Sequence, residues 1–162
     1  AQVKRLIIGA TSNWSRNVLL WNFAADPLND PHTDNGGCSM CQGAVTLDGN
    51  NVTRNLAYYV VAHASKFVVP GSTRIASTQS GDIVVNTTTD EERPEVMRIA
   101  AYGTQTVLPN VAFSTPDGKI VLIVVNDTGS AVGFSIMYDG QSVALRLNSG
   151  AVGTYVWSCC GS

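Results

Sequence analysis

The chain has 162 residues, of which 44% are hydrophobic and 14% charged, and its formal net charge at neutral pH is -2. This length and composition suffice for a buried hydrophobic core, in one domain or slightly more. Charges are scattered without a basic stripe, and no apolar run reaches the roughly 20 residues of a membrane-spanning helix, so we expect no nucleic-acid partner and no membrane span.

The first part of the chain has a mixed pattern of helix and strand. Apolar residues recur at spacings of three and four within residues 2–10, which predicts a helix. Residues 17–24 are continuously apolar, as in a strand buried on both faces of a parallel sheet. A polar loop is expected from residue 26 to about 51, and the apolar spacing in residues 54–68 predicts an amphipathic helix packed on that sheet.

Beyond Pro70 the pattern changes to short apolar runs between turn signals, so we place a domain boundary there, between residues 1–70 and 71–162. In residues 143–147 every second side chain is apolar, as in a strand with one buried face. Strands are expected at 73–78, 82–87, 97–102, 106–114, 119–126, 132–139, 142–148 and 151–157. We therefore predict a mainly β fold, an antiparallel β-sandwich of about eight strands preceded by a helix-strand-helix segment.

The helix-strand-helix segment looks incomplete as a structural unit. A helix, one buried strand, a long loop and a second helix are the closing elements of a larger α/β array. A parallel strand needs neighbouring strands, which this part of the chain does not supply. We therefore expect an N-terminal part, on the same or a separate polypeptide, to provide them.

The four cysteines form two close pairs, Cys38 with Cys41 and Cys159 with Cys160. The first pair could be a redox pair, half of a zinc site with His32 as third ligand, or a disulfide that closes its loop. The glycine-rich loop is not a helix start, and there is no second Cys-x-x-Cys, so we expect the disulfide. Adjacent cysteines bond only in a strained ring, which leaves the state of the second pair open.

Secretion is expected from the even number of cysteines and from four Asn-x-Ser/Thr sequons. The sequons begin at Asn13, Asn51, Asn86 and Asn126.

Two stretches of the chain carry a family resemblance. Residues 13–27 contain Trp21-Asn22-Phe-Ala followed by Asp-Pro, and residues 59–75 contain His63-Ala-Ser-Lys-Phe-Val-Val-Pro-Gly-Ser-Thr-Arg-Ile. They resemble the eighth barrel strand and the barrel-to-sandwich signature of glycoside hydrolase family 30, which includes glucosylceramidases and endo-β-1,6-glucanases. The likeness extends over essentially the whole chain and implies the end of a TIM barrel fused to a β-sandwich.

The resemblance implies hydrolysis of β-glycosidic bonds with retention, by two glutamates at the ends of barrel strands four and seven. Such hydrolysis needs two carboxyl groups roughly 5 to 5.5 Å apart. The glutamates of this chain are Glu91, Glu92 and Glu95, in a charged turn that we expect to be solvated. We therefore expect no catalytic residue, no metal and no cofactor here, and no hydrolysis by the chain alone.

Trp21 and Asn22 match the strand-eight motif, where the tryptophan walls the sugar site. An indole face suits a pyranose ring, and an amide both donates and accepts hydrogen bonds, although Trp21 could instead be barrel core. Successive strand residues face opposite ways, so both could point into the barrel mouth only at a bulge. Asp26, His32 and Asp34 follow the strand and could line the cleft or only cap their loop.

These expectations combine into one function and one alternative. We expect the C-terminal portion of a secreted retaining β-glycosidase for β-linked glucosyl substrates, with a carbohydrate and the missing barrel as partners. The alternative is a stand-alone carbohydrate-binding or structural β-sandwich module without catalysis. His63 is expected to be structural, and Trp14 and Trp157 to lie in the core or at a domain interface.

Overall fold

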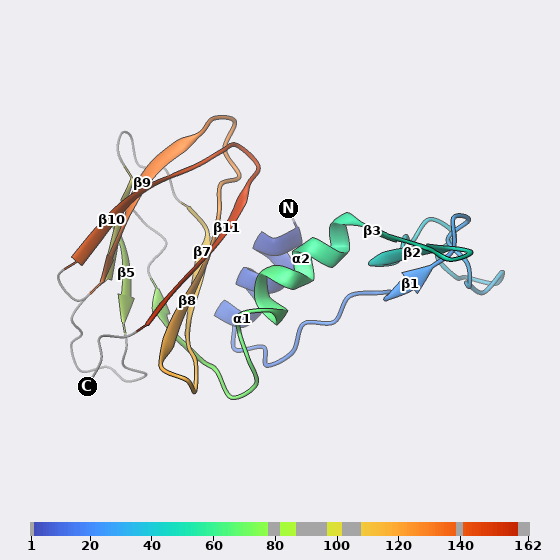
Figure 1. The fold of residues 1–162 in the computed structure, drawn as a ribbon, viewed down its shortest axis with the longest axis horizontal. Coiled ribbons are helices and arrows are strands. Elements are labelled where there is room, and N and C mark those ends of the chain that lie inside the picture. Colours follow the sequence, from blue (N-terminus) through green and yellow to red (C-terminus); the bar gives the residue numbers. More distant parts are fainter. Residues whose placement is uncertain (1, 78–81, 87–96, 102–107, 139–140, 159–162) are drawn as a thin grey trace.

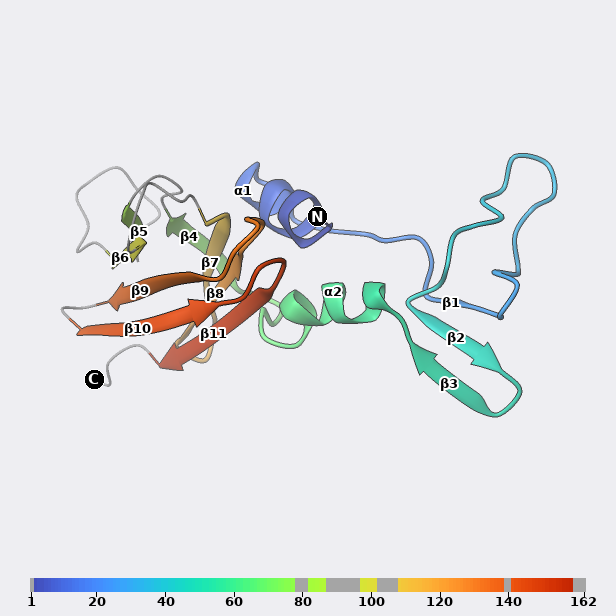
Figure 2. The ribbon, with the colours of Figure 1, turned by 90° about the horizontal axis from the view of Figure 1, so that it is seen from above.

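The computed structural model describes residues 2–77, 82–86, 97–101, 108–138 and 141–158, with only the backbone described at 76, 82–86 and 97–101. A β-sandwich lies at one end, two helices cover one of its faces, and an arm extends beyond the helices (Figure 1). Viewed from above, the helices lie between the sandwich and a small sheet at the end of the arm (Figure 2). Among the described residues, no helix has the length and apolarity that a membrane span requires.

The first helix consists of η1 (Val3–Gly9), which has π-helical hydrogen bonds, and α1 (Ala10–Ser12). Val3, Ile7 and Ile8 are buried against the sandwich. The second helix, α2 (Leu56–Ser65), lies within the predicted range of 54–68. Both predicted helices are therefore present.

The strand predicted at residues 17–24 is not formed, which corrects that expectation. Only β1 (Ala24–Ala25) pairs, in parallel with β2 (Val45–Asp48), and Leu19 is 91% exposed. The physical reason is that a strand buried on both faces needs neighbouring strands on both edges, and β2 is the one parallel neighbour among the described residues.

The polar loop predicted from residue 26 to about 51 ends earlier than expected. Its last residues form β2, which pairs with β3 (Asn51–Arg54) as an antiparallel hairpin in which Asp48 is opposite Asn51. Gly49 has φ +55°, a conformation that a tight hairpin turn requires and that glycine adopts without strain. The hairpin and the loop between β1 and β2 together form the outer end of the arm (Figure 2).

The partner of helix α2 also differs from the prediction. Its buried residue Val60 packs in a cluster with η1 and the outer face of the sandwich, and not on a barrel sheet. Leu56 and Tyr59, which the apolar spacing assigned to a buried face, are 73% and 52% exposed. Part of the apolar face of the helix is therefore exposed, because no barrel sheet covers it among the described residues.

The sandwich contains all eight predicted strands, so the mainly β fold class is confirmed. They are β4 (Thr73–Ser77), β5 (Asp82–Asn86), β6 (Met97–Ala101), β7 (Asn110–Ser114), β8 (Lys119–Val125), β9 (Val132–Tyr138), β10 (Gln141–Leu147) and β11 (Val152–Ser158). Their order is β10-β9-β6-β5-β4-β7-β8-β11, with every pairing antiparallel. Strands β10 and β11 are thus consecutive in the chain but lie at the two ends of the order.

Strand β8 is buried on both faces and joins two hydrophobic clusters. Ile120, Leu122 and Val124 face the interior of the sandwich, and the alternate residues Val121 and Ile123 face η1 and α2. Each such side chain contributes roughly 1.5 to 3 kcal/mol through its burial. The two helices of the first part therefore share a core with the sandwich, and the boundary at Pro70 stays a prediction.

Candidate functional site

The residues predicted to contact a sugar lie in the arm. Trp21 is 79% exposed, and its peptide bond to Asn22 is cis. The carbonyl oxygen of Asn22 accepts a hydrogen bond from the Ala44 amide at 2.9 Å. The side-chain Oδ1 of Asn22 is buried and finds no donor among the described residues. The arm therefore has an exposed indole at Trp21, followed by an amide oxygen that is buried and has no donor among the described residues.

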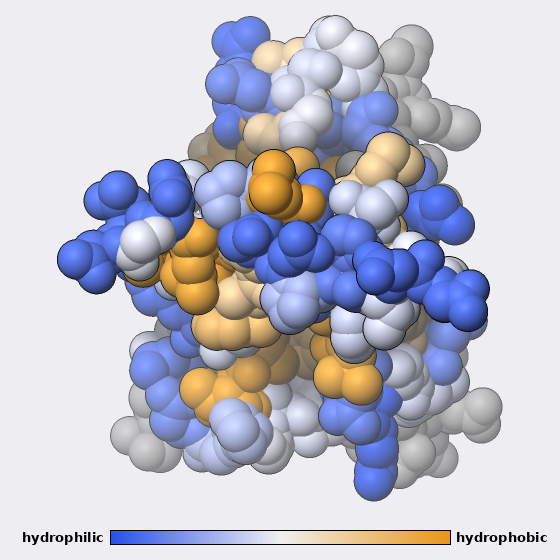
Figure 3. Space-filling model, turned by 90° about the vertical axis from the view of Figure 1, so that its right-hand side faces the viewer, coloured by the Kyte–Doolittle hydropathy of each residue, from blue (hydrophilic) through white to orange (hydrophobic). Residues whose placement is uncertain are grey.

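Exposure alternates along the segment that leads to β1. Leu19, Trp21 and Phe23 are 91%, 79% and 77% exposed, whereas Leu20 packs on the helix cluster. The alternation has the period of a strand, with one set of side chains left uncovered. Seen end-on, the arm carries apolar side chains among hydrophilic ones (Figure 3). A row of exposed large apolar side chains along one segment suits a contact with another protein segment or a ligand.

Asp26 organises its own loop. Its Oδ1 accepts hydrogen bonds from the amides of Leu28 at 2.8 Å and Asp30 at 2.9 Å, and its own amide donates to the Asp30 carbonyl at 2.8 Å. This arrangement is an Asx turn, in which the carboxylate replaces a backbone acceptor. The geometry corresponds to the loop-capping alternative for Asp26.

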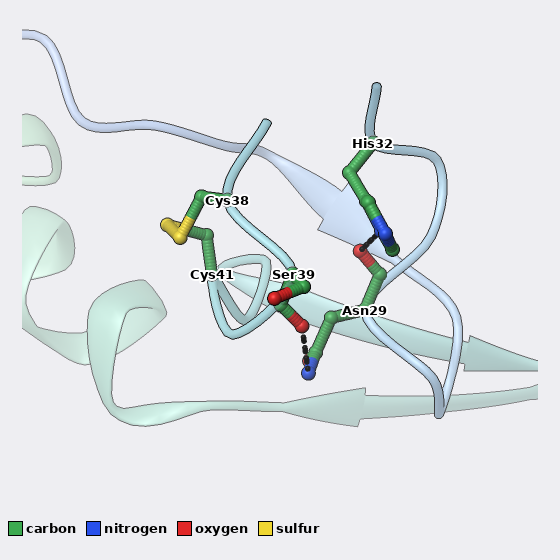
Figure 4. Close-up of a disulfide and its surroundings, with 5 residues drawn as sticks. All are labelled: Asn29, His32, Cys38, Ser39 and Cys41. Atoms are coloured by element: carbon green, nitrogen blue, oxygen red, sulfur yellow. Dashed lines mark hydrogen bonds between the residues drawn. A yellow bond between two sulfur atoms is a disulfide. The ribbon is translucent and has the colours of Figure 1, made fainter. Parts of the chain in front are cut away.

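His32 is held by the same turn. Its Nδ1 lies 2.7 Å from Oδ1 of Asp30 and 3.3 Å from the carbonyl oxygen of Asn29. The Asn29 side chain donates to the Ser39 carbonyl at 3.3 Å and so connects the two halves of the loop (Figure 4). Asp34 is exposed. His32 therefore contributes to the shape of the loop through Nδ1, whatever its other nitrogen contacts.

Cys38 and Cys41 form a disulfide near the end of the loop (Figure 4). Their thiolates are therefore not available as zinc ligands, and among the described residues no group of three His, Cys, Asp or Glu side chains could hold a metal ion. The loop returns to its start at Gly43, where a Cβ atom would lie 2.6 Å from the Ala25 amide nitrogen. Glycine is thus required for this close approach.

Several predicted features fall outside the described residues. These are Glu91, Glu92 and Glu95 in the charged turn and Cys159 and Cys160 near the end of the chain.

Three residues remain, His63, Trp14 and Trp157, which are expected to have structural roles. Nδ1 of His63 lies 2.9 Å from Oγ1 of Thr154 in β11, a partner distant in sequence, so the side chain joins α2 to the sandwich and its structural role stays a prediction. Trp14 is 78% exposed and so is not core, and the Arg74 guanidinium lies 4.3 Å from its ring centroid. Trp14 and Arg74 lie on opposite sides of the boundary predicted at Pro70, so this contact is the kind expected of a residue at a domain interface. Trp157 is partly buried at the margin of the sandwich core.

A groove of about 530 Å³ opens between the edge strands β10 and β11. Tyr138 and Trp157 line it, with ring centroids 5.7 Å apart, as does Tyr155, which packs on Phe134 at 5.9 Å. Nε1 of Trp157 is buried and finds no acceptor among the described residues. Alternation in the sequence indicates that these rings face inward, but only the strand order reveals that they lie at an open edge.

Comparison with known proteins gives consistent results along the chain. Residues 97–155 match the profile described as the glycosyl hydrolase family 30 beta sandwich domain. Endo-1,6-beta-D-glucanase neg1 of Aspergillus fumigatus is 30% identical over 156 residues, and Endo-1,6-beta-D-glucanase BGN16.3 of Trichoderma harzianum is 26% identical over the same length. These matches cover 96% of this chain but only 28% of each relative.

Two solved structures have the same fold. The endo-beta1,6-glucanase BT3312 superposes with a TM-score of 0.70 at 24% identity, and SrfJ from Salmonella typhimurium with 0.70 at 20%. Each match covers 98% of this chain and 30% of the other chain. The fold, the matched β-sandwich domain and the two curated relatives agree. Residues 97–155 therefore match the beta sandwich domain of glycosyl hydrolase family 30, and the chain as a whole is similar to part of two endo-1,6-beta-D-glucanases.

Proposed function

We propose that this chain is the C-terminal portion of a secreted, retaining endo-β-1,6-glucanase. It would supply the last barrel strand, part of the sugar-site wall and the β-sandwich. The names of both curated relatives support the reaction, since both are called endo-1,6-beta-D-glucanases. The observation that carries the proposal is the alternating exposure of Leu19, Trp21 and Phe23 in a segment that begins a parallel pairing at β1. Such a segment suits a barrel strand whose neighbours come from elsewhere.

The remainder of the barrel would convert the arm into a site. Residues 17–24 would become the eighth strand, with residues 1–70 as the end of the barrel domain and 71–162 as the sandwich domain. Ligands of such barrels bind at the C-terminal ends of the strands. Trp21 and Asn22 would lie near that end of the eighth strand, just before β1 and the disulfide loop. The catalytic glutamates would come from the upstream part.

Each predicted site residue has a distinct proposed role. Trp21, whose side chain is exposed, would stack on the apolar face of a glucosyl unit. Asn22 Oδ1 is buried without a donor among the described residues, so it would accept a hydrogen bond from a sugar hydroxyl only once the assembled barrel uncovers it. Asp26 and His32 would act by holding the loop that walls the cleft, because their observed contacts are with loop atoms. None of these roles requires a metal or a cofactor.

The test is to reconstitute the barrel with the upstream polypeptide and to measure hydrolysis of β-1,6-glucan, glucosylceramide and an aryl β-glucoside. We expect turnover of β-1,6-glucan by the reconstituted protein and none by the chain alone. Trp21→Ala should lower kcat/KM about tenfold, which corresponds to about 1.4 kcal/mol of lost binding. Trp14→Ala, which removes an exposed tryptophan outside the arm, is the matched control. An unchanged kcat/KM in the Trp21 variant would refute its proposed role.

The groove between β10 and β11 favours a second candidate, a non-catalytic carbohydrate-binding module. Aromatic side chains and the polar residues Gln141, Ser142 and Thr154 line this groove, as in many sugar sites. In that case the chain alone would bind soluble β-glucan in a calorimetric titration. Trp157→Ala, which removes an aromatic ring from the lining of the groove, would weaken that binding, whereas Trp21→Ala would not.

A further inference from the structure

The structure separates the glycosylation sequons by their surroundings. Oligosaccharide can remain on an asparagine only if the folded protein leaves space at Nδ2 and does not use both of its hydrogens. Asn126 fails on both counts. It is 0% exposed, and its Nδ2 donates to the carbonyl oxygens of Ser130 at 2.8 Å and Leu147 at 2.9 Å. The side chain of Asn126 is therefore used for hydrogen bonds within the folded chain.

The sequon at Asn13 is also engaged. Asn13 Nδ2 donates to the Gly9 carbonyl at 2.8 Å, where it satisfies a group at the end of the first helix. Trp14 has φ +66° and stacks with Arg74, and the Ser15 hydroxyl donates to the Asn17 carbonyl at 2.7 Å. Each residue of this sequon therefore contributes to the turn that follows the first helix. The side chain of Asn86 lies outside the described residues.

The sequon Asn51-Val52-Thr53 has none of these commitments. All four residues of β3 are exposed, and no described residue bonds the side-chain amide of Asn51. Asn51 and Thr53 are two apart in a strand, so their side chains lie on the same face. Asn51 is at the turn end of the hairpin, opposite Asp48, at the outer end of the arm (Figure 2). Its exposure leaves the side-chain amide open to solvent.

We propose that Asn51 is an N-glycosylation site of this protein in a eukaryotic secretory pathway, an inference that rests on the proposed secretion. The donor class is a lipid-linked oligosaccharide pyrophosphate. Nδ2 of Asn51 bonds to the anomeric carbon and loses a proton, the bond from that carbon to the phosphate oxygen breaks, and the lipid pyrophosphate leaves. No oxidant or reductant is needed.

A glycan at this position would also protect an unpaired edge. β3 is the outer strand of the order β1-β2-β3, and Val52 is 65% exposed on it. Exposed edge strands with apolar side chains promote association between molecules. A hydrated oligosaccharide at the end of this strand would hinder such pairing.

The test uses the protein, with its upstream polypeptide, secreted from yeast behind a host leader, so that its natural route is not assumed. Peptide N-glycosidase treatment in heavy-oxygen water converts an occupied asparagine to labelled aspartate, which peptide mass spectrometry locates. We expect the label at Asn51 and none at Asn126. Asn51→Gln and Thr53→Ala should each remove one glycan from the electrophoretic pattern.

Two outcomes would overturn the assignment. One is unlabelled Asn51 in protein recovered from the medium, and the other is label at Asn126. Hydrolysis of β-1,6-glucan, measured on the same samples, is expected to be equal for Asn51→Gln and the unsubstituted protein. Absence of hydrolysis with a labelled Asn51 would count against the proposed enzyme and not against the glycosylation site, so the two failures are distinguishable.

Discussion

At the scale of single residues, Asn126 connects two turns of the sandwich. Its side-chain amide donates to Ser130 and Leu147, and its Oδ1 accepts from the amide of Thr128 at 3.0 Å and the hydroxyl of Thr128 at 2.7 Å. Its backbone amide donates to the Ala151 carbonyl at 3.0 Å. The turn between β8 and β9 is thus bonded to the turn between β10 and β11.

We predict that Asn126→Asp destabilises the chain by about 3 kcal/mol or more, because an ionised carboxylate would be buried facing two carbonyl oxygens. The loss should decrease at acidic pH, where a protonated carboxyl can donate one of the two bonds. Urea unfolding followed by tryptophan fluorescence measures both effects. Thr128→Ala, which removes one hydroxyl from the same network, should cost about 1 kcal/mol. Equal midpoints for Asn126→Asp and the unsubstituted chain would contradict this account.

At the scale of elements, helix α2 is bonded to strand β11 through His63. Nδ1 of His63 and Oγ1 of Thr154 are 2.9 Å apart, and Thr154 Oγ1 donates to the His63 carbonyl at 3.3 Å. The hydroxyl proton is thus used, so the neutral ring donates from Nδ1. Burial lowers the pKa of His63 below its usual 6.5, because the charged ring loses hydration there.

The lowered pKa of His63 predicts a pH-dependent stability. Between its folded pKa and the unfolded pKa of 6.5, the unfolded chain binds more protons. The free energy of unfolding should therefore fall as the pH drops through 6.5. His63→Gln should reduce this slope in urea titrations at several pH values. Thr154→Val should keep the slope while losing about 1 kcal/mol at all of them, and an unaltered slope in His63→Gln would disprove the assignment.

At the scale of the whole molecule, the arm and the sandwich differ in how completely they are covered. The sandwich has helices on one face and a filled interior, whereas the arm exposes Leu19, Phe23, Leu28 and Met40 at 75% or more. Exposing apolar surface of this kind to water costs free energy, and this cost falls when another surface covers it. The arm is therefore the part of the chain most dependent on a partner.

We predict that the isolated chain associates at micromolar concentration and that the upstream polypeptide abolishes this association. Replacing Leu19 and Phe23 together with serine should shift the isolated chain toward monomer in light scattering. Val143→Ser, which removes an apolar side chain that is 51% exposed in β10, is the control outside the arm. A monomeric unsubstituted chain would mean that the arm is covered in a way that this structure does not contain.

The sequence by itself determined the eight sandwich strands, both helices and the resemblance to glycosyl hydrolase family 30. Alternation, helical spacing and turn residues act between neighbours in the chain, so they are readable without the fold. The tertiary structure decided what needs distant partners. Among the described residues, segment 17–24 has a neighbouring strand only at Ala24, where β1 begins. Helix α2 packs on the sandwich, and β10 and β11 become edges. Two identical sequon patterns likewise differ, because burial at Asn126 and exposure at Asn51 depend on contacts across the fold.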